Sequence, residues 1–157
     1  LVIHAPTHRG VKGTEFIVNA IKMLQSEGVE FDFELIEGLS HKDALKIYER
    51  ADLLIDQLLI GWYGGLAVEL MAMGKPVICY IREEDLVFLP DGMRQDLPII
   101  NANPENIYEV LKQKIQGESI ESLVDIGKRS RIYVEKWHDP QMTSLQLKAN
   151  YESILSK

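Results

Sequence analysis

A glycine pair at a predicted helix start carries the strongest chemical signal in this sequence. Gly64 and Gly65 open the segment 64–73, and Glu69 follows Gly65 by four residues, on the same helix face. The first amides of a helix lack partners within the helix and carry a partial positive charge, so they attract anions. Glycine lets a phosphate approach the backbone, and a carboxylate one turn later can accept hydrogen bonds from sugar hydroxyls. The spacing favours a nucleotide or nucleotide-sugar site.

The same pattern also has a purely structural explanation. A loop, a glycine pair, an amphipathic helix, a glycine stop at Gly74 and a strand led by Pro76 are what any βαβ unit needs in order to fold. The residues at the other strand ends must therefore distinguish the two explanations.

The order of apolar and polar segments predicts an α/β fold. We expect five strands, at residues 1–5, 31–37, 52–56, 76–81 and 98–101. We expect helices over 14–27, after the cap residue Ser40, and over 64–73, 104–116, 119–137 and 140–156. Alternation with short connections predicts a doubly wound, Rossmann-like parallel sheet of order 2-1-3-4-5 with C-terminal helices, in one domain spanning 1–157.

Local patterns refine three of these helices. In the segment 14–27, the residues expected on the buried face are Phe16, Ile17, Ala20, Ile21 and Leu24. Ser40 and Asp43 form a predicted capping box, and Asn103 followed by Pro104 predicts the start of the helix that ends near residue 116.

Two loops meet at the switch point that this strand order creates between strands 1 and 3. They cover residues 6–13 and 57–64, and ligands of doubly wound sheets bind at such a point. The first loop carries Arg9 and Lys12, a guanidinium fork and an ammonium that suit a diphosphate. A polar, solvated loop is the alternative for this segment alone.

Composition excludes several classes of function. Seventeen basic residues against 24 acidic ones give a net charge of −7, which argues against non-specific nucleic-acid binding. No apolar run approaches ~20 residues, so we expect no membrane-spanning helix and a cytoplasmic location. The single cysteine, Cys79, excludes an internal disulfide and lies in an apolar run, where a buried hydrophobe is expected. No carboxylate cluster suits magnesium, so no metal is expected.

Three segments carry a family resemblance. They are Lys12-Gly13 before an amphipathic helix, the run 48–52 (Tyr-Glu-Arg-Ala-Asp), and the run 64–78, which reads Gly-Gly-x3-Glu-x-Met-Ala-x-Gly-Lys-Pro-Val-Ile. Together they resemble the C-terminal, nucleotide-sugar-binding half of GT-B-fold glycosyltransferases of the retaining, group 1 (family 4) type.

The resemblance implies the donor-binding half of a retaining glycosyltransferase, which transfers a sugar from a nucleoside-diphosphate sugar to an acceptor that the sequence does not identify. It implies that Lys12 and Arg9 neutralise the diphosphate leaving group, with the amides of Gly64 and Gly65, and without a cofactor or an obligatory metal. Glu69 would hold the ribose hydroxyls. The loop after strand 2, which contains Gly38 and Ser40, is expected to flank the base.

Two departures from the family pattern leave a second function open. The family motif places a glutamate at the position of Gly61, where it is associated with the donor sugar, and its arginine falls at residue 6 or 7 rather than at Arg9. The alternative is a degenerate, non-catalytic nucleotide-binding or interaction domain of flavodoxin-like topology.

The sequence opens on Leu1, inside an apolar run and without a methionine, so we expect a fragment that lacks an N-terminal acceptor domain. The expected partners are a nucleotide sugar and that missing domain. An apolar stripe near the C-terminus, formed by Leu147, Tyr151, Ile154 and Leu155, would meet that domain or form a self-contact. The basic stretch 128–136 is expected to be a solvated face, with peripheral membrane association of the full-length enzyme, at the inner face of the membrane, as the alternative.

Overall fold

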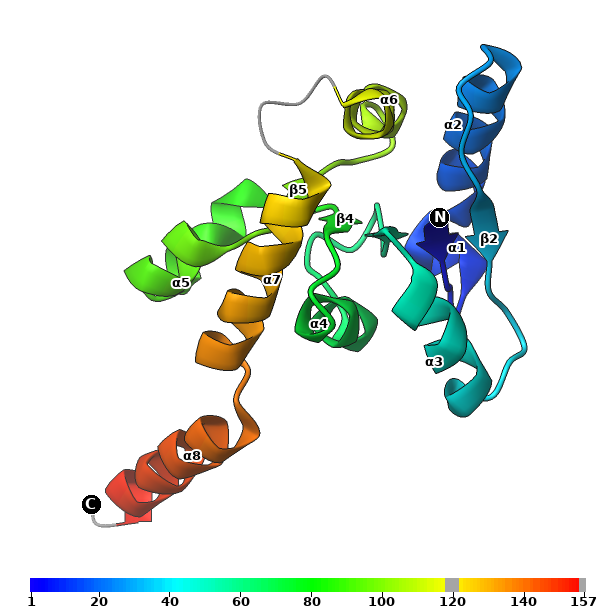
Figure 1. The fold of residues 1–157 in the computed structure, drawn as a ribbon. Coiled ribbons are helices and arrows are strands. Elements are labelled where there is room, and N and C mark those ends of the chain that lie inside the picture. The colour runs from blue at the N-terminus through cyan, green and yellow to red at the C-terminus, as the bar shows by residue number, and fades with distance from the viewer. Residues whose placement is uncertain (118–121, 156–157) are drawn as a thin grey trace.

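A five-stranded parallel sheet forms the centre of the molecule (Figure 1). The computed structural model describes residues 1–117 and 122–155. The strands are β1 (Val2–His4), β2 (Phe33–Leu35), β3 (Leu53–Ile55), β4 (Val77–Cys79) and β5 (Ile100–Asn101). Their order is β2-β1-β3-β4-β5, with every neighbouring pair parallel. The predicted Rossmann-like, doubly wound fold is confirmed, and its switch point lies between β1 and β3.

Helices cover both faces of this sheet. The elements are α1 (Arg9–Lys12), α2 (Thr14–Ser26), α3 (His41–Arg50), α4 (Gly65–Ala72), the 3-10 helix η1 (Glu83–Phe88), α5 (Asp91–Asp96), α6 (Ile107–Gln116), α7 (Leu123–Trp137) and α8 (Pro140–Leu155). α2 packs beside α6, and α4 packs against α7 (Figure 1). The apolar cluster on one face contains residues of α3, α4 and α7, and that on the other contains residues of α2 and α6.

Strand residues alternate between the two apolar clusters, as the period of two requires. Ile3 and Leu54 join the cluster of α3, α4 and α7, whereas Val2 and Leu53 join that of α2 and α6. These side chains are buried on both faces, which explains why the strands read as continuous apolar runs in the sequence.

Three local expectations were wrong. Part of the loop 6–13 forms the helical turn α1, since the His8 side chain accepts a hydrogen bond from the Val11 amide. Phe16 is 45% exposed, because it lies beside the buried face of α2 rather than on it. Asn103 does not begin the helix that ends near residue 116. Its side chain accepts from the Glu105 amide and caps a turn, and α6 begins at Ile107.

The contact between α4 and α7 depends on a glycine. A β-carbon placed on Gly127 of α7 would overlap the carbonyl oxygen of Gly74, the residue that ends the α4 segment in a left-handed conformation. The backbone of α7 therefore lies directly against the turn between α4 and β4. This close approach fixes the axis of α7 relative to the sheet.

The last helix, α8, extends away from the body of the domain (Figure 1). Leu147, Tyr151, Ile154 and Leu155 are all exposed, as expected for a stripe without a covering partner within the described chain. Among residues 1–117 and 122–155, no helix is long and apolar enough to cross a membrane.

Candidate functional site

Lys12 is held at the switch point by the geometry of the residue that follows it. Gly13 ends α1 in a left-handed conformation (φ +73°), and its amide donates to the Arg9 carbonyl. A β-carbon on Gly13 would lie 3.3 Å from the Leu58 side chain, so only glycine fits this turn comfortably. The Leu58 amide donates to the Lys12 carbonyl over 3.1 Å. These contacts fasten the loop after β1 to the loop after β3.

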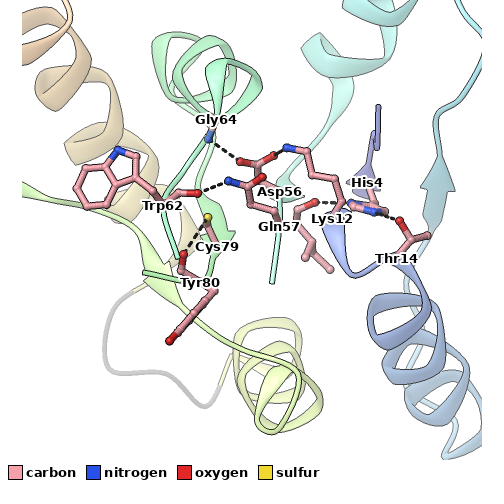
Figure 2. Close-up of polar contacts among 10 residues, drawn as sticks. His4, Lys12, Thr14, Asp56, Gln57, Trp62, Gly64, Cys79 and Tyr80 are labelled. Carbon is pink, nitrogen blue, oxygen red and sulfur yellow. Dashed lines mark hydrogen bonds and ion pairs between the residues drawn. The ribbon is translucent and has the colours of Figure 1, made fainter. Parts of the chain in front are cut away.

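The Lys12 ammonium and the start of α4 meet on one buried carboxylate, that of Asp56 (Figure 2). Lys12 Nζ lies 2.6 Å from Asp56 Oδ1, and the Gly64 amide donates to Asp56 Oδ2 over 3.0 Å. The Asp56 side chain is fully buried, whereas that of Lys12 is 11% exposed. The two loops that sequence reasoning proposed as anion-binding thus converge within a few ångströms.

The loop between β3 and α4 is anchored by polar and aromatic contacts. The Gln57 side-chain amide donates to the Trp62 carbonyl (Figure 2), and the Tyr80 amide donates to the Gln57 carbonyl over 2.8 Å. Trp62 stacks on Tyr63 with ring centroids 4.8 Å apart. These contacts fix the backbone that leads into the glycine pair.

Tyr63 ties this loop to the C-terminal part of the domain. Its hydroxyl lies 2.9 Å from that of Tyr133 in α7 and 3.0 Å from Nε2 of His138, just after α7. Burial raises the pKa of both tyrosine hydroxyls and lowers that of His138. The three groups therefore stay uncharged near neutral pH and act as a hydrogen-bonded brace for the loop.

The first turn of α4 is open to a ligand. A β-carbon on Gly65 would meet no atom within 4 Å, and Gly64 serves as the helix N-cap without a side chain. Glu69, one turn further on, is exposed, and its Oε2 lies 3.0 Å from Nε2 of His41 at the start of α3. The carboxylate proposed for the ribose thus faces the loop that follows β2.

Arg9 does not share the Asp56 contact with Lys12. Its guanidinium makes a two-pronged pair with Glu37, just after β2, with Nε 2.8 Å from Oε1. This hydrogen-bonded pair raises the pKa of Arg9 and lowers that of Glu37. Both side chains remain partly exposed at the mouth of the switch point, so a ligand can compete for them.

Gly38 and Ser40 lie in the expected loop, but Ser40 has a structural task there. Its hydroxyl accepts from the Asp43 amide over 3.2 Å and donates to the Asp43 carboxylate over 2.7 Å, which confirms the predicted cap of α3. Gly38 is left-handed (φ +68°) and exposed, and a β-carbon there would meet nothing within 4 Å. Gly38 therefore allows the chain to turn between β2 and α3.

Gly61 cannot be exchanged for the glutamate of the family pattern without strain. It is left-handed (φ +89°), and a β-carbon would lie 3.1 Å from Cβ of Arg82 and 3.3 Å from its Nε. The Arg82 amide donates to the Gly61 carbonyl over 2.9 Å. A guanidinium therefore lies beside the backbone where the family pattern has a carboxylate side chain.

A buried histidine lies next to this site, at the carboxyl end of β1 (Figure 2). Nδ1 of His4 donates to the Ile55 carbonyl over 2.7 Å, because a carbonyl can only accept, and Nε2 then accepts from the Thr14 hydroxyl over 2.8 Å. Burial lowers the pKa of His4, so the ring is neutral. It links β1, β3 and the start of α2.

The neutral state of His4 makes stability depend on pH. Below pH 6.5, the ordinary pKa of histidine, His4 binds a proton in the unfolded chain but stays neutral in the folded chain. We therefore expect the free energy of unfolding to fall as the pH drops below about 6.5. The slope approaches about 1.4 kcal/mol per pH unit for each such histidine, and His138, whose pKa is also lowered, adds to it.

Urea unfolding of the parent chain and of His4→Gln, measured from pH 7.5 to pH 5, checks this expectation. The variant should lose the His4 part of the slope and retain that of His138. Parallel curves for the two proteins would show that His4 takes up its proton equally in both states.

Cys79 is fully buried, as expected, and burial raises its pKa, so it stays a thiol and is no nucleophile. No group of three or more potential metal ligands occurs within residues 1–117 and 122–155.

Asp56 is the candidate site residue that sequence reasoning missed. A signal was available, since Asp56 directly follows β3 at the switch point, where the carboxyl ends of parallel strands collect ligand-binding groups. The sequence pattern alone predicts only that Asp56 ends the strand 52–56. A separate hollow of about 670 Å³ lies at the opposite ends of the strands, lined by residues 51–52, 74–76 and several residues of α7.

No protein-family model and no curated protein matches this chain.

Proposed function

We propose that this chain is the donor-binding half of a retaining glycosyltransferase and that the nucleoside diphosphate of the donor binds at the switch point, between the loop after β1 and the start of α4. The observation that carries the proposal is the convergence of the Lys12 ammonium and the first amide of α4 on one point. A cation and a helix N-terminus that meet at the carboxyl ends of a parallel sheet are the recurrent features of phosphate sites in this fold.

The proposed chemistry is stabilisation of a leaving group. As the glycosidic bond breaks, negative charge develops on the diphosphate, and donors that are already in place lower the barrier because they need no reorganisation. Lys12 and the amides of Gly64 and Gly65 take this role, and Arg9 joins them if the diphosphate draws it from Glu37. Glu69 accepts hydrogen bonds from the ribose hydroxyls, and the loop of Gly38 and Ser40 flanks the base.

One observation favours the second candidate, a nucleotide-binding or interaction domain without catalysis. Gly61 is left-handed and Arg82 lies against it, so no side chain from position 61 reaches a donor sugar. A domain of that kind would bind nucleoside diphosphates as tightly as the corresponding nucleotide sugars. A donor-binding domain should instead gain affinity from the sugar.

Calorimetry with the diphosphates of uridine, guanosine and adenosine, each with and without a chelator, tests the proposal. We expect binding of at least one of them, at unchanged affinity in the chelator, because the proposed donors to the diphosphate are Lys12 and the α4 amides and not a metal ion. Failure to bind any of the three, or binding abolished by the chelator, would contradict it.

Two variants separate the proposed roles. Lys12→Gln keeps a donor for Asp56 but removes the charge, so the affinity should fall about tenfold at low salt and the loss should shrink as salt rises. Glu69→Gln should also cost about tenfold, because it replaces charge-assisted hydrogen bonds to the ribose by weaker neutral ones, and with little dependence on salt, because the ribose hydroxyls carry no charge. Calorimetry at 20 mM and 300 mM salt measures both, and identical salt profiles would refute the division of roles.

A further inference from the structure

The proposed diphosphate site is already filled by an anion of the protein itself. One oxygen of the Asp56 carboxylate accepts from the Lys12 ammonium over 2.6 Å, and the other accepts from the Gly64 amide over 3.0 Å (Figure 2). These are the same two kinds of donor that an incoming phosphate would use. The carboxylate is fully buried, so water hardly screens its charge from Lys12.

We propose that Asp56 is an internal competitor that holds Lys12 and the α4 amide until a diphosphate takes them over. The inference rests on the proposed function of the switch point and adds the step by which the diphosphate enters and leaves the site. Because the carboxylate cancels the charge of Lys12 at close range, a weakly charged anion gains little there. A diphosphate carries enough negative charge to compete with Asp56 for Lys12 and the α4 amide. When the product leaves, these two donors bind Asp56 again.

The surroundings of Asp56 allow this exchange. The Lys12 side chain retains 11% exposure, so part of it is accessible to a ligand from solvent. A β-carbon on Gly65 would find nothing within 4 Å, which leaves the approach to the first turn of α4 open.

If Asp56 had a purely positioning role, its neutralisation would change the affinity for anions in the opposite direction. If the carboxylate only oriented Lys12 toward the ligand, its neutralisation would disorder Lys12 and weaken anion binding. If it competes with the ligand, its neutralisation frees the ammonium and strengthens binding. The substitution Asp56→Asn, which nearly preserves shape, therefore distinguishes the two roles by direction and not merely by size.

The experiment is a calorimetric titration of the parent chain and of Asp56→Asn with inorganic pyrophosphate at two salt concentrations. We expect the variant to bind pyrophosphate about tenfold more tightly at low salt, with a steeper decline as salt rises. Glu135→Gln is the control, because Glu135 is an exposed carboxylate in α7 that pairs with Arg131 over 2.6 Å. That control should change the affinity by less than about twofold. Equal or weaker binding by Asp56→Asn, or no binding of pyrophosphate by either protein, would overturn the proposal.

Thermal unfolding gives a second readout, which remains informative if the variant is poorly stable. Without added anion, Asp56→Asn should melt below the parent, since Lys12 has lost its partner, and pyrophosphate should raise the melting temperature of the variant more than that of the parent. An equal or smaller rise would overturn the proposal.

The unaltered chain supplies a third test, which does not depend on any variant folding. During a pyrophosphate titration the amide resonance of Gly64 should shift, because its acceptor changes from a carboxylate to a phosphate. Binding without any change at Gly64 would refute the exchange of partners. The proposed function is judged separately by the titrations with nucleoside diphosphates, so a failure of the exchange can be told from a failure of the proposed function.

Discussion

Replacement of Lys12 by methionine is expected to lower the free energy of unfolding by about 3–5 kcal/mol, because it leaves the Asp56 carboxylate buried without its counter-charge. The Gly64 amide alone cannot compensate a full negative charge in that place. Chemical denaturation monitored by circular dichroism measures the loss.

The double variant Lys12→Met/Asp56→Asn tests whether the unpaired charge is the cause. Asparagine can still accept from the Gly64 amide and carries no charge, so the double variant should be more stable than Lys12→Met alone. If Lys12→Met costs less than about 1 kcal/mol, or if the second substitution makes the loss larger, then water reaches the carboxylate and the buried pair does not organise the site.

Replacement of Gly127 by alanine should produce a loss of comparable size through packing alone. The new methyl group would overlap the Gly74 carbonyl oxygen, which belongs to the backbone and cannot rotate away, so α7 must shift off α4. We expect about 2–4 kcal/mol of destabilisation, at the upper end of what overpacking costs. Calorimetric melting measures it directly.

The matched control for this prediction is Gly10→Ala. Gly10 is exposed in α1, and the nearest atom to a β-carbon there, in the His8 ring, is 3.6 Å away. This substitution should leave the melting temperature unchanged or slightly raise it. Equal effects of the two substitutions would mean that the loss at Gly127 does not come from its contact with Gly74.

The fold was predictable because its strands and helices differ in period and length. Buried runs such as 53–55 and 77–79 are too short and too uniformly apolar for helices, and α2 and α3 show a clear buried face between cap and stop residues. Short βα connections then leave little choice of topology. The cap at Ser40 was predictable for the same reason, since a capping box depends only on neighbouring residues.

Other features depend on contacts that a single sequence does not display. The two-pronged pairing of Arg9 with Glu37 joins residues 28 positions apart. Asp56 looks like any polar residue after a strand until Lys12 and Gly64 are seen to meet on it. Tertiary pairing of charges, rather than local pattern, decides where these side chains point.

We propose above all that a nucleoside diphosphate binds between the loop after β1 and the start of α4. The most direct test is a titration of the ¹⁵N-labelled chain with uridine, guanosine and adenosine diphosphates, followed residue by residue by NMR. We predict saturable shifts concentrated at residues 9–13 and 61–69, with smaller ones after β2 at residues 38–41. Shifts that gather instead around the hollow at residues 51–52 and 74–76, or no saturable shifts with any of the three, would contradict the account.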